Sequence, residues 1–194
     1  MRKLVITSLK GGSGKSTLAA NLAVEAEKTG AGPVSLVDTD YPQGSLSYWW
    51  NEREAESPLF ASTLDVAGVA LFVMDTAPQI PPVEMVRQAD LVVIPVRPSP
   101  NDLRAVGATL QVVEAEHKPF CFVINAIKYN TRIATNTLQV LAQHGRVAPV
   151  MIGDSVNLSE SMISGQVASE YAPGCKSAAE MMQLWKYVYT LLNK

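Results

Sequence analysis

The residues best suited to chemistry in this 194-residue chain lie in one glycine-rich segment near its start. Residues 10–17 are Lys-Gly-Gly-Ser-Gly-Lys-Ser-Thr, between an apolar run and a helix-like pattern. Glycines let the backbone curl so that its N–H groups face phosphate oxygens, and the positive end of the following helix faces the same anion. Lys15 can reach the β- and γ-phosphates, and Ser16 can offer its hydroxyl to Mg²⁺. The segment therefore predicts a nucleotide-phosphate loop made of Gly11, Gly12, Ser13, Gly14, Lys15, Ser16 and Thr17.

This loop departs from the ordinary G-x-x-x-x-G-K-[ST] pattern. Leu9 stands where the first glycine belongs, and Lys10 adds a second lysine at the start of the loop. A lysine at that position is poorly placed for the nucleotide of its own chain and well placed to enter the site of a partner. We therefore expect a homodimer with ATP at its interface. The alternative, a glycine-rich turn with an exposed lysine, does not account for eight matching residues between a strand and a helix.

Short apolar runs alternate with longer amphipathic ones along the chain. The short runs are apolar throughout, which suits parallel strands covered on both faces. Apolar residues at helical spacing predict the helices, and Ser99, Pro100 and Asp102 form a typical helix start. The predicted strands are 3–9, 33–38, 69–75, 91–96, 120–125 and 147–152, and the predicted helices are 15–28, one from 100, 133–144, 178–192 and a short one with a charged face around 48–56.

The alternation of strands and helices predicts the fold class. We expect an α/β fold with a single doubly wound, mostly parallel sheet flanked by helices, of the P-loop NTPase type. A chain of this length is expected to form one domain over residues 1–194. The tryptophans Trp49 and Trp50 are expected to be packing anchors.

Aspartates stand at the ends of two more predicted strands. Asp38 and Asp40 follow the second strand, and Asp75 ends the third. Ligands of such sheets bind at the carboxyl ends of the strands, so these carboxylates should meet the phosphate loop. Mg²⁺ prefers oxygen ligands and keeps several waters, so we expect it to be held by Ser16, Asp38 and Asp75. Asp40 can orient or deprotonate the attacking water. For any one of these aspartates the alternative is a turn or a helix cap.

Composition argues against several classes of protein. The chain is 47% hydrophobic and 18% charged, which fits a soluble globular protein, and no apolar run approaches a membrane span. The apolar part of the N-terminal segment is too short for a signal peptide, so we expect a cytoplasmic protein without a membrane partner. Cys121 and Cys175 lack metal-binding spacing, and Cys121 is expected in the core.

The charge distribution suggests a second kind of partner. The net charge is −2, yet no Asp or Glu occurs between Glu116 and Asp154. The basic residues of this stretch lie either on an ordinary solvated face or in a patch that attracts DNA phosphates regardless of sequence. In the second interpretation, DNA is contacted by Lys128, Arg132 and Arg146.

Several motifs together resemble the ParA/MinD family of deviant Walker A ATPases. They are the loop at 10–17, the segment Asp-Thr-Asp-Tyr-Pro-Gln-Gly-Ser at 38–45, the strand ending at Asp75 and the run at 94–100. The short, single-domain, ParF-like partition proteins are the most similar type, and residues 158–160 and 170–171 also resemble late segments of ParA proteins. The resemblance implies an ATP-dependent sandwich dimer, with Lys10, Lys15 and Asp40 as its catalytic residues.

The resemblance also implies a function. Proteins of the ParA type are ATPases, slow unless stimulated, that bind DNA nonspecifically as ATP dimers. We therefore expect ATP and Mg²⁺ as cofactors, nucleoid association in the ATP state and a ParB-like or adaptor activator protein. The cargo would be a plasmid, a chromosome or a protein cluster. Tyr41, inserted before Pro42, and Leu9, in place of a frequent proline, depart from the family pattern.

Other functions remain to be weighed against this one. A MinD-like, membrane-cycling ATPase needs a terminal amphipathic helix, whereas the helix at 178–192 has the pattern of core packing. A small-molecule kinase or ligase needs a separate polar substrate pocket, which the sequence does not indicate. An iron–sulfur carrier is disfavoured because two distant cysteines do not easily supply a subunit-bridging cluster. The strand end at Asn125 is a candidate place for adenine.

Overall fold

A parallel β-sheet forms the centre of the computed structural model, which describes residues 1–40, 44–129 and 131–194. Within these residues the sheet has six strands in the order β3-β2-β4-β1-β5-β6, and every neighbouring pair is parallel. The predicted α/β fold is confirmed. The strands are β1 (Arg2–Ile6), β2 (Val34–Asp38), β3 (Leu59–Phe60), β4 (Leu71–Asp75), β5 (Leu91–Val96) and β6 (Phe120–Ile124).

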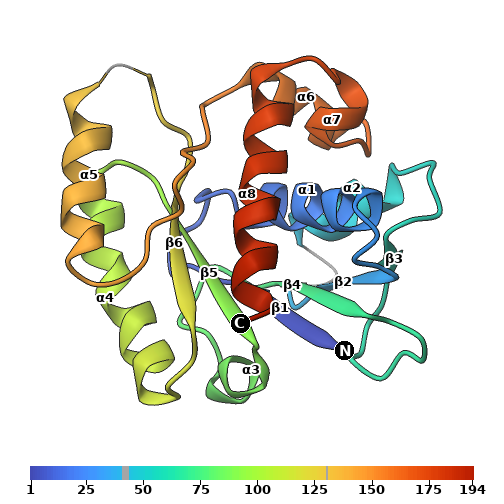
Figure 1. Cartoon of the computed structure of the whole chain (residues 1–194), viewed down its shortest axis with the longest axis horizontal. Helices are drawn as coiled ribbons and strands as arrows, with labels where there is room; N and C mark the ends of the chain where they lie inside the picture. Colours follow the sequence, from blue (N-terminus) through green and yellow to red (C-terminus); the bar gives the residue numbers. More distant parts are fainter. Residues whose placement is uncertain (41–43, 130) are drawn as a thin grey trace.

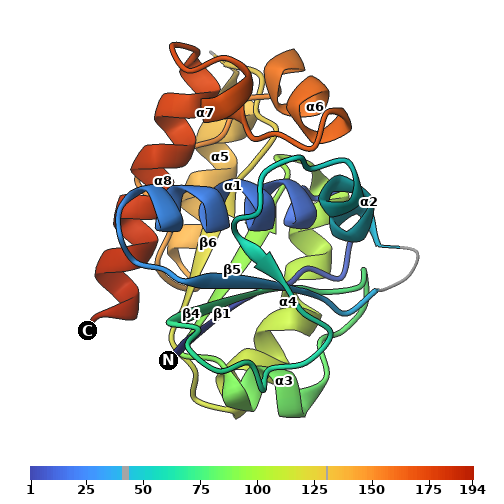
Figure 2. The ribbon, with the colours of Figure 1, turned by 90° about the vertical axis from the view of Figure 1, so that its right-hand side faces the viewer.

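Helices cover both faces of this sheet (Figure 1). One face is covered by α1 (Lys15–Lys28), α2 (Ser45–Asn51), α6 (Val156–Ile163), α7 (Ala168–Tyr171) and α8 (Lys176–Leu192), and the other by α3 (Val83–Gln88), α4 (Pro100–Ala115) and α5 (Arg132–Ala142). Figure 2 shows α1 and α8 on one side of the sheet and α3 and α4 on the opposite side.

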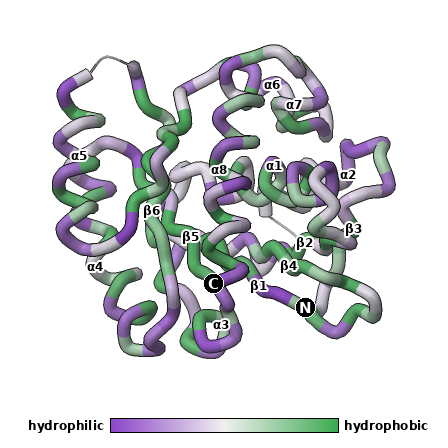
Figure 3. The backbone as a smooth tube through the Cα atoms, in the orientation of Figure 1, coloured by the Kyte–Doolittle hydropathy of each residue, from purple (hydrophilic) through white to green (hydrophobic). Residues whose placement is uncertain are grey.

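Alternate residues of each strand supply the two cores. In β1, Leu4 and Ile6 pack beneath α1 and α8, while Val5 belongs to the core beneath α4. Each strand is therefore apolar on both faces, and Figure 3 shows hydrophobic residues along β4 and β5. This arrangement explains why the strands have continuous apolar patterns rather than alternating ones.

The parallel register aligns the strand ends that carry polar groups. Ile6 pairs with Asp75, and Asp75 pairs with Asp38, across β1, β4 and β2. The loop that follows β1 therefore emerges at the same level of the sheet as both aspartates. Because β1 lies between β4 and β5, this loop is central in the edge formed by the carboxyl ends.

The predicted strand at 147–152 is wrong. This segment makes isolated bridges to the region of β6, at Val147 and Gly153, and the amide of Ile152 donates to Ile124 at 2.9 Å. Pro149 lies between these contacts and has no N–H to donate, which explains why a continuous ladder does not form. The two-residue β3 was not predicted because so short a strand leaves no periodic pattern.

The helices follow the predictions most closely where a local signal marks their ends. Helix α1 has the predicted bounds, and Ser99 caps α4 by accepting a hydrogen bond from the Asp102 amide at 3.1 Å. Helix α2 ends at Asn51, so the predicted charged helical face beyond it is wrong. Helices α3, α6 and α7 were not predicted.

The aromatic and sulfur-containing side chains pack as expected. Trp49 is buried, and its indole N–H donates to the Gln166 carbonyl at 2.8 Å. Trp50 stacks on Phe60 with ring centroids 5.7 Å apart. Cys121 is buried in the core, as predicted. These contacts fix α2 between the sheet and the segment that joins α6 to α7.

Helix α8 buries its apolar face against α1. Its buried residues include Met181, Leu184 and Trp185, which confirms the predicted core packing. Among the described residues, no helix combines the length and the apolar character needed to cross a bilayer.

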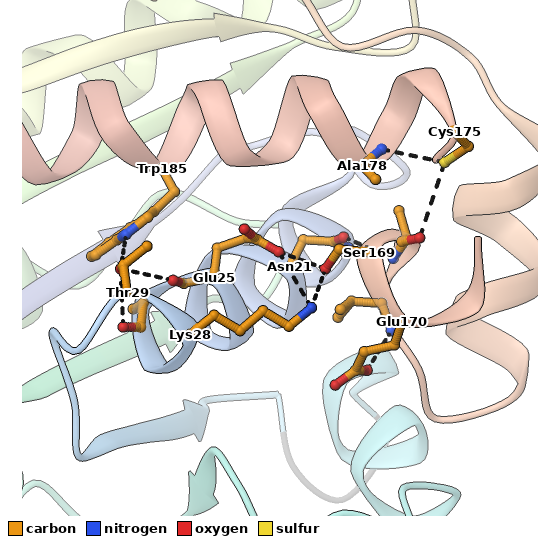
Figure 4. Close-up of polar contacts among 12 residues, drawn as sticks. Asn21, Glu25, Lys28, Thr29, Ser169, Glu170, Cys175, Ala178 and Trp185 are labelled. Atoms are coloured by element: carbon orange, nitrogen blue, oxygen red, sulfur yellow. Dashed lines mark hydrogen bonds and ion pairs between the residues drawn. The ribbon is translucent and has the colours of Figure 1, made fainter. Parts of the chain in front are cut away.

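Polar contacts also join α1 to α7 and α8 (Figure 4). The Trp185 indole N–H donates to Thr29 Oγ1 at 2.7 Å, and the Ala168 amide donates to Asn21 Oδ1 at 3.1 Å. Ser169 Oγ donates to the buried Glu25 carboxylate at 2.5 Å. These contacts hold the helix whose N-terminus faces the phosphate loop.

Candidate functional site

The glycine-rich loop has the backbone conformation expected of a phosphate-binding loop. Gly12 and Gly14 have φ angles of 70° and 93°, in the left-handed region that favours glycine. Gly14 is also the N-cap of α1, so the helix begins at Lys15. The loop can therefore direct backbone N–H groups and the positive end of α1 toward one anion.

The Asn125 side chain supports this loop from the end of β6. Its Nδ2 donates to the Ser13 carbonyl at 2.7 Å, and the amide is buried. A Cβ at Gly14 would lie 2.0 Å from the same nitrogen, so no larger residue fits beside it. The sequence indicated the strand end at Asn125 as a candidate place for adenine. The structure shows that this side chain braces the loop, and its role toward adenine stays a prediction.

A cavity of about 630 Å³ opens above the loop. Its walls come from the loop itself, from the ends of β4 and β5, from α2 and from the end of α6. They include Gly11, Gly12, Gly14, Lys15, Ser16, Thr17, Asp40, Tyr48, Glu52, Asp75, Thr76, Arg97, Met162 and Ile163.

Ser16 and Asp75 meet at the base of this cavity. The Ser16 hydroxyl donates to Asp75 Oδ2 at 2.5 Å, while Asp75 Oδ1 and Thr76 Oγ1 are buried without a hydrogen-bond partner among the described residues. Burial raises the pKa of Asp75 to about 7, opposed by the Ser16 hydrogen bond and the charge of Lys15. Mg²⁺ prefers oxygen ligands, and here a buried carboxylate oxygen that accepts no hydrogen bond among the described residues lies beside a hydroxyl oxygen. Ser16 and Asp75 therefore fit that ion.

Lys15 lies among the negative groups of the cavity. Its Nζ donates to the Lys10 carbonyl at 3.3 Å. Burial lowers the pKa of Lys15, and the charges of Asp75 and Asp40 oppose that shift. The ammonium group is thus partly desolvated and close to the base of the loop, where a phosphate would gain from its charge.

The two aspartates that follow β2 have different surroundings. Asp38 is buried and accepts hydrogen bonds from the Asp40 amide at 2.9 Å and from the amide and hydroxyl of Ser47 at 2.9 and 2.7 Å. These contacts hold the first turn of α2. Asp38 thus has the role at a helix end that the sequence left open as an alternative. Its role as a magnesium ligand stays a prediction. Asp40 is exposed and lines the cavity.

The predicted cross-subunit lysine has an exposed side chain. Lys10 is outside the walls of the cavity, although its carbonyl accepts the Lys15 hydrogen bond. No ion pair among the described residues includes Lys10. The inserted Tyr41, together with Pro42 and Gln43, lies outside the described residues.

The residues predicted to bind DNA lie at the two ends of α5, and their role stays a prediction. Lys128 and Arg132 lie close together in sequence at the start of α5, and Arg146 follows its other end. All three side chains are exposed. A helix of 11 residues is about 16 Å long, so α5 separates Arg146 from the other two.

Several cavity residues were not predicted. Met162 and Ile163 reach it from α6, whose position depends on tertiary packing and leaves no local signal. Arg97 lines the cavity and directly follows β5, the strand next to β1. Its position after a predicted strand was the sequence signal that could have identified it as a cavity residue.

Comparisons with known proteins agree with this geometry. The family described as CbiA, the CobQ/CobB/MinD/ParA nucleotide binding domain, matches residues 4–168. One similar relative is the "Maintenance of carboxysome distribution protein A" of Halothiobacillus neapolitanus, which is 34% identical over 131 residues that make up 59% of each chain. Another is "Protein ParA" of Rhizobium radiobacter, which is 33% identical over 140 residues. The second match covers 61% of this chain and 59% of that protein. The chain thus spans about three fifths of the length of these relatives.

The fold is also similar to that of a solved structure. The septum site-determining protein MinD of Pyrococcus horikoshii, complexed with Mg-ADP, superposes with a TM-score of 0.79 at 16% identity. The match covers 98% of this chain and 96% of that one. At this identity the likeness concerns the fold.

The buried Asp75 carboxyl generates a prediction about stability without metal or nucleotide. Its pKa rises from 3.8 to about 7 on folding, so the native state loses stability as the pH rises from the lower value through the higher one. Asp75→Asn removes the buried charge in a side chain of the same shape. We expect the variant to unfold several degrees above the wild type at about pH 8, and the gap to shrink at about pH 5.

Thermal unfolding in the presence of a chelator measures this difference. Asp65→Asn is the matched control because Asp65 is exposed, and it should show no comparable pH-dependent gap. Equal midpoints for wild type and Asp75→Asn at the higher pH would contradict the prediction.

Proposed function

The chain belongs to the CobQ/CobB/MinD/ParA nucleotide-binding family, and from this premise we propose that it is a ParA-type ATPase that dimerises on ATP, binds DNA nonspecifically and positions or segregates a cargo. Hydrolysis would be slow until a ParB-like or adaptor protein stimulates it. The relatives named above support a cargo of the plasmid or protein-cluster kind, since one is a ParA protein and the other maintains carboxysome distribution.

The observation that carries the proposal is the Ser16–Asp75 pair at the base of a cavity bounded by a two-lysine loop. A P-loop alone would suit many nucleotide-binding proteins. The additional Lys10, with an exposed side chain beyond the cavity wall, is what favours a dimer with nucleotide between the subunits. Lys10 would then supply its charge to the phosphates of the partner subunit.

Each residue of the site has a distinct role in this proposal. The loop amides and Lys15 bind the phosphates, and Thr17 contributes a hydroxyl at the start of α1. Ser16, Asp75 and Asp38 would hold Mg²⁺, which neutralises phosphate charge when bound, and Asp38 also fixes the start of α2. Asp40 orients or deprotonates the attacking water from the exposed side of the cavity.

Lys10→Ala tests the dimer. Removing the cross-subunit cation should weaken ATP-dependent dimerisation by about 100-fold or more, the effect of losing a charged hydrogen-bonding partner in a desolvated interface, while the monomer still binds nucleotide. Sedimentation velocity with ATP and Mg²⁺ measures it. Lys3→Ala is the control, because Lys3 lies on β1 away from the cavity. A normal ATP dimer of the Lys10 variant would count against the proposed arrangement.

Asp40→Ala tests hydrolysis. Loss of the group that serves the water should lower turnover by roughly 10² to 10³-fold and leave ATP binding intact, so the ATP dimer should accumulate. Phosphate release and gel filtration measure the two effects. Glu54→Ala, an exposed carboxylate outside the cavity, is the control. Unchanged turnover in the Asp40 variant would remove this residue from the mechanism.

DNA binding by the ATP form is the third test. Random-sequence DNA should bind only with ATP, and with about four phosphate contacts per dimer its affinity should fall about 100-fold between 50 and 200 mM salt. Arg132→Glu should weaken binding more than Arg146→Glu if DNA is contacted at the start of α5, because only Arg132 is close to Lys128 along the chain. If ATP-loaded protein does not bind DNA at low salt but binds anionic vesicles, the protein is of the membrane-cycling type. Phosphorylation of a small molecule would instead indicate a kinase.

A further inference from the structure

Arg97 brings a cation to the nucleotide cavity from the side of β5. It directly follows β5 (Leu91–Val96), which pairs with β1, so it emerges next to the phosphate loop. Arg97 lines the same cavity as Lys15 and Ser16. One guanidinium nitrogen lies 3.8 Å from the position that a Cβ at Gly12 would occupy. The side chain therefore lies against the loop itself.

Contacts with carboxylates do not explain the position of Arg97. The ion-paired arginines of the described residues are Arg2, Arg53 and Arg87, whose partners are Asp90, Glu170 and Glu116. Arg97 is exposed and is in none of the ion pairs or side-chain hydrogen bonds among those residues. Within residues 1–40, 44–129 and 131–194, its five N–H donors are thus not engaged by another side chain.

The charges on the cavity wall favour an anionic ligand at this position. Three carboxylates line the cavity, on Asp40, Glu52 and Asp75, against the cations of Lys15 and Arg97. A triphosphate adds several negative charges, so each cation on the wall matters for binding. A guanidinium can donate two parallel hydrogen bonds to one phosphate, which an ammonium group cannot do.

The place of Gly12 in the loop indicates which phosphate is near. Helix α1 begins at Lys15, so the loop N–H groups beside it would cradle the α- and β-phosphates, while Lys15 would reach outward to the β- and γ-phosphates. Gly12 lies two residues before Gly14, the N-cap of α1, so a phosphate chain that starts at the helix would have its far end beside Gly12. The guanidinium beside Gly12 would therefore be nearer to the terminal phosphate than to the first one.

We propose that Arg97 binds the terminal phosphate of the nucleotide within its own subunit and so makes the site prefer ATP over ADP. This inference rests on the proposed ATPase function and adds a residue to its site. Lys10 would act across the subunit boundary, whereas Arg97 acts within one chain. The two cations would approach the same phosphate from different sides.

Arg97→Ala and Arg97→Lys test this assignment in the Lys10→Ala background, which removes the cross-subunit cation and keeps the protein monomeric. Titration calorimetry with a non-hydrolysable ATP analogue and with ADP, both with Mg²⁺, gives the two affinities. We expect Arg97→Ala to weaken binding of the analogue about tenfold and of ADP less than about twofold, as for the loss of one charge-assisted contact. Arg97→Lys should retain part of the preference.

Arg104→Ala is the matched control, because Arg104 is exposed on α4 and lines the groove between α4 and α5 rather than the nucleotide cavity. The ratio of its affinities for the ATP analogue and for ADP should equal the ratio of the Lys10→Ala protein that carries wild-type Arg104. An unchanged ratio in Arg97→Ala, or an equal loss for both nucleotides, would overturn the assignment of Arg97 to the terminal phosphate.

The proposed function fails in a different way. If protein with wild-type Lys10 and Arg97 binds neither nucleotide, or if Lys15→Ala leaves binding unchanged, the ATPase proposal itself is wrong. If nucleotide binding needs Lys15 but the affinity ratio does not respond to Arg97, only the present inference is wrong.

Discussion

Parallel pairing of β4 with β1 on one side and β2 on the other places Ile6, Asp75 and Asp38 at one level of the sheet. From that level the phosphate loop turns into α1, and Ser16 meets Asp75. A shift of one residue in the β1–β4 pairing would move Asp75 to the opposite face and separate it from Ser16, since side chains alternate along a strand. The chemistry of the site thus depends on strand register before it depends on any individual side chain.

The remaining walls of the cavity are held by contacts between distant parts of the sequence. Helix α2 is fixed at its start by Asp38 and beyond its end by Arg53, which donates to the Gly165 carbonyl and forms an ion pair with Glu170 at 2.8 Å. The Arg53 side chain is only 4% exposed, so removing Glu170 alone would leave a buried charge without its partner. Helix α6 ends just before Gly165, where Arg53 makes these contacts. The positions of Tyr48 and Ile163 on the cavity wall therefore depend on the same hydrogen bond and ion pair.

Features set by neighbouring residues could be predicted from the sequence. The β1–loop–α1 unit, the Ser99 cap of α4 and the buried strands all have short-range patterns. The segment at 147–152 has the composition of a strand but contains Pro149, and the ladder forms only as isolated bridges. The bracing of Ser13 by Asn125 joins residues 112 positions apart, and no local pattern indicates such a contact. The separation of Arg146 from Lys128 likewise follows from the length of α5 rather than from their proximity along the chain.

The sheet order also governs when the molecule can assemble during synthesis. Strand β1 precedes both of its neighbours in the chain, β4 and β5, which end at Asp75 and Val96. A nascent chain therefore keeps a strongly apolar strand without its sheet neighbours until the segments of β4 and β5 have been made. Pairing over such separations is slow, and unpaired apolar strands are prone to aggregation. The central position of β1 thus leaves the growing chain open to aggregation until both neighbouring strands have been added.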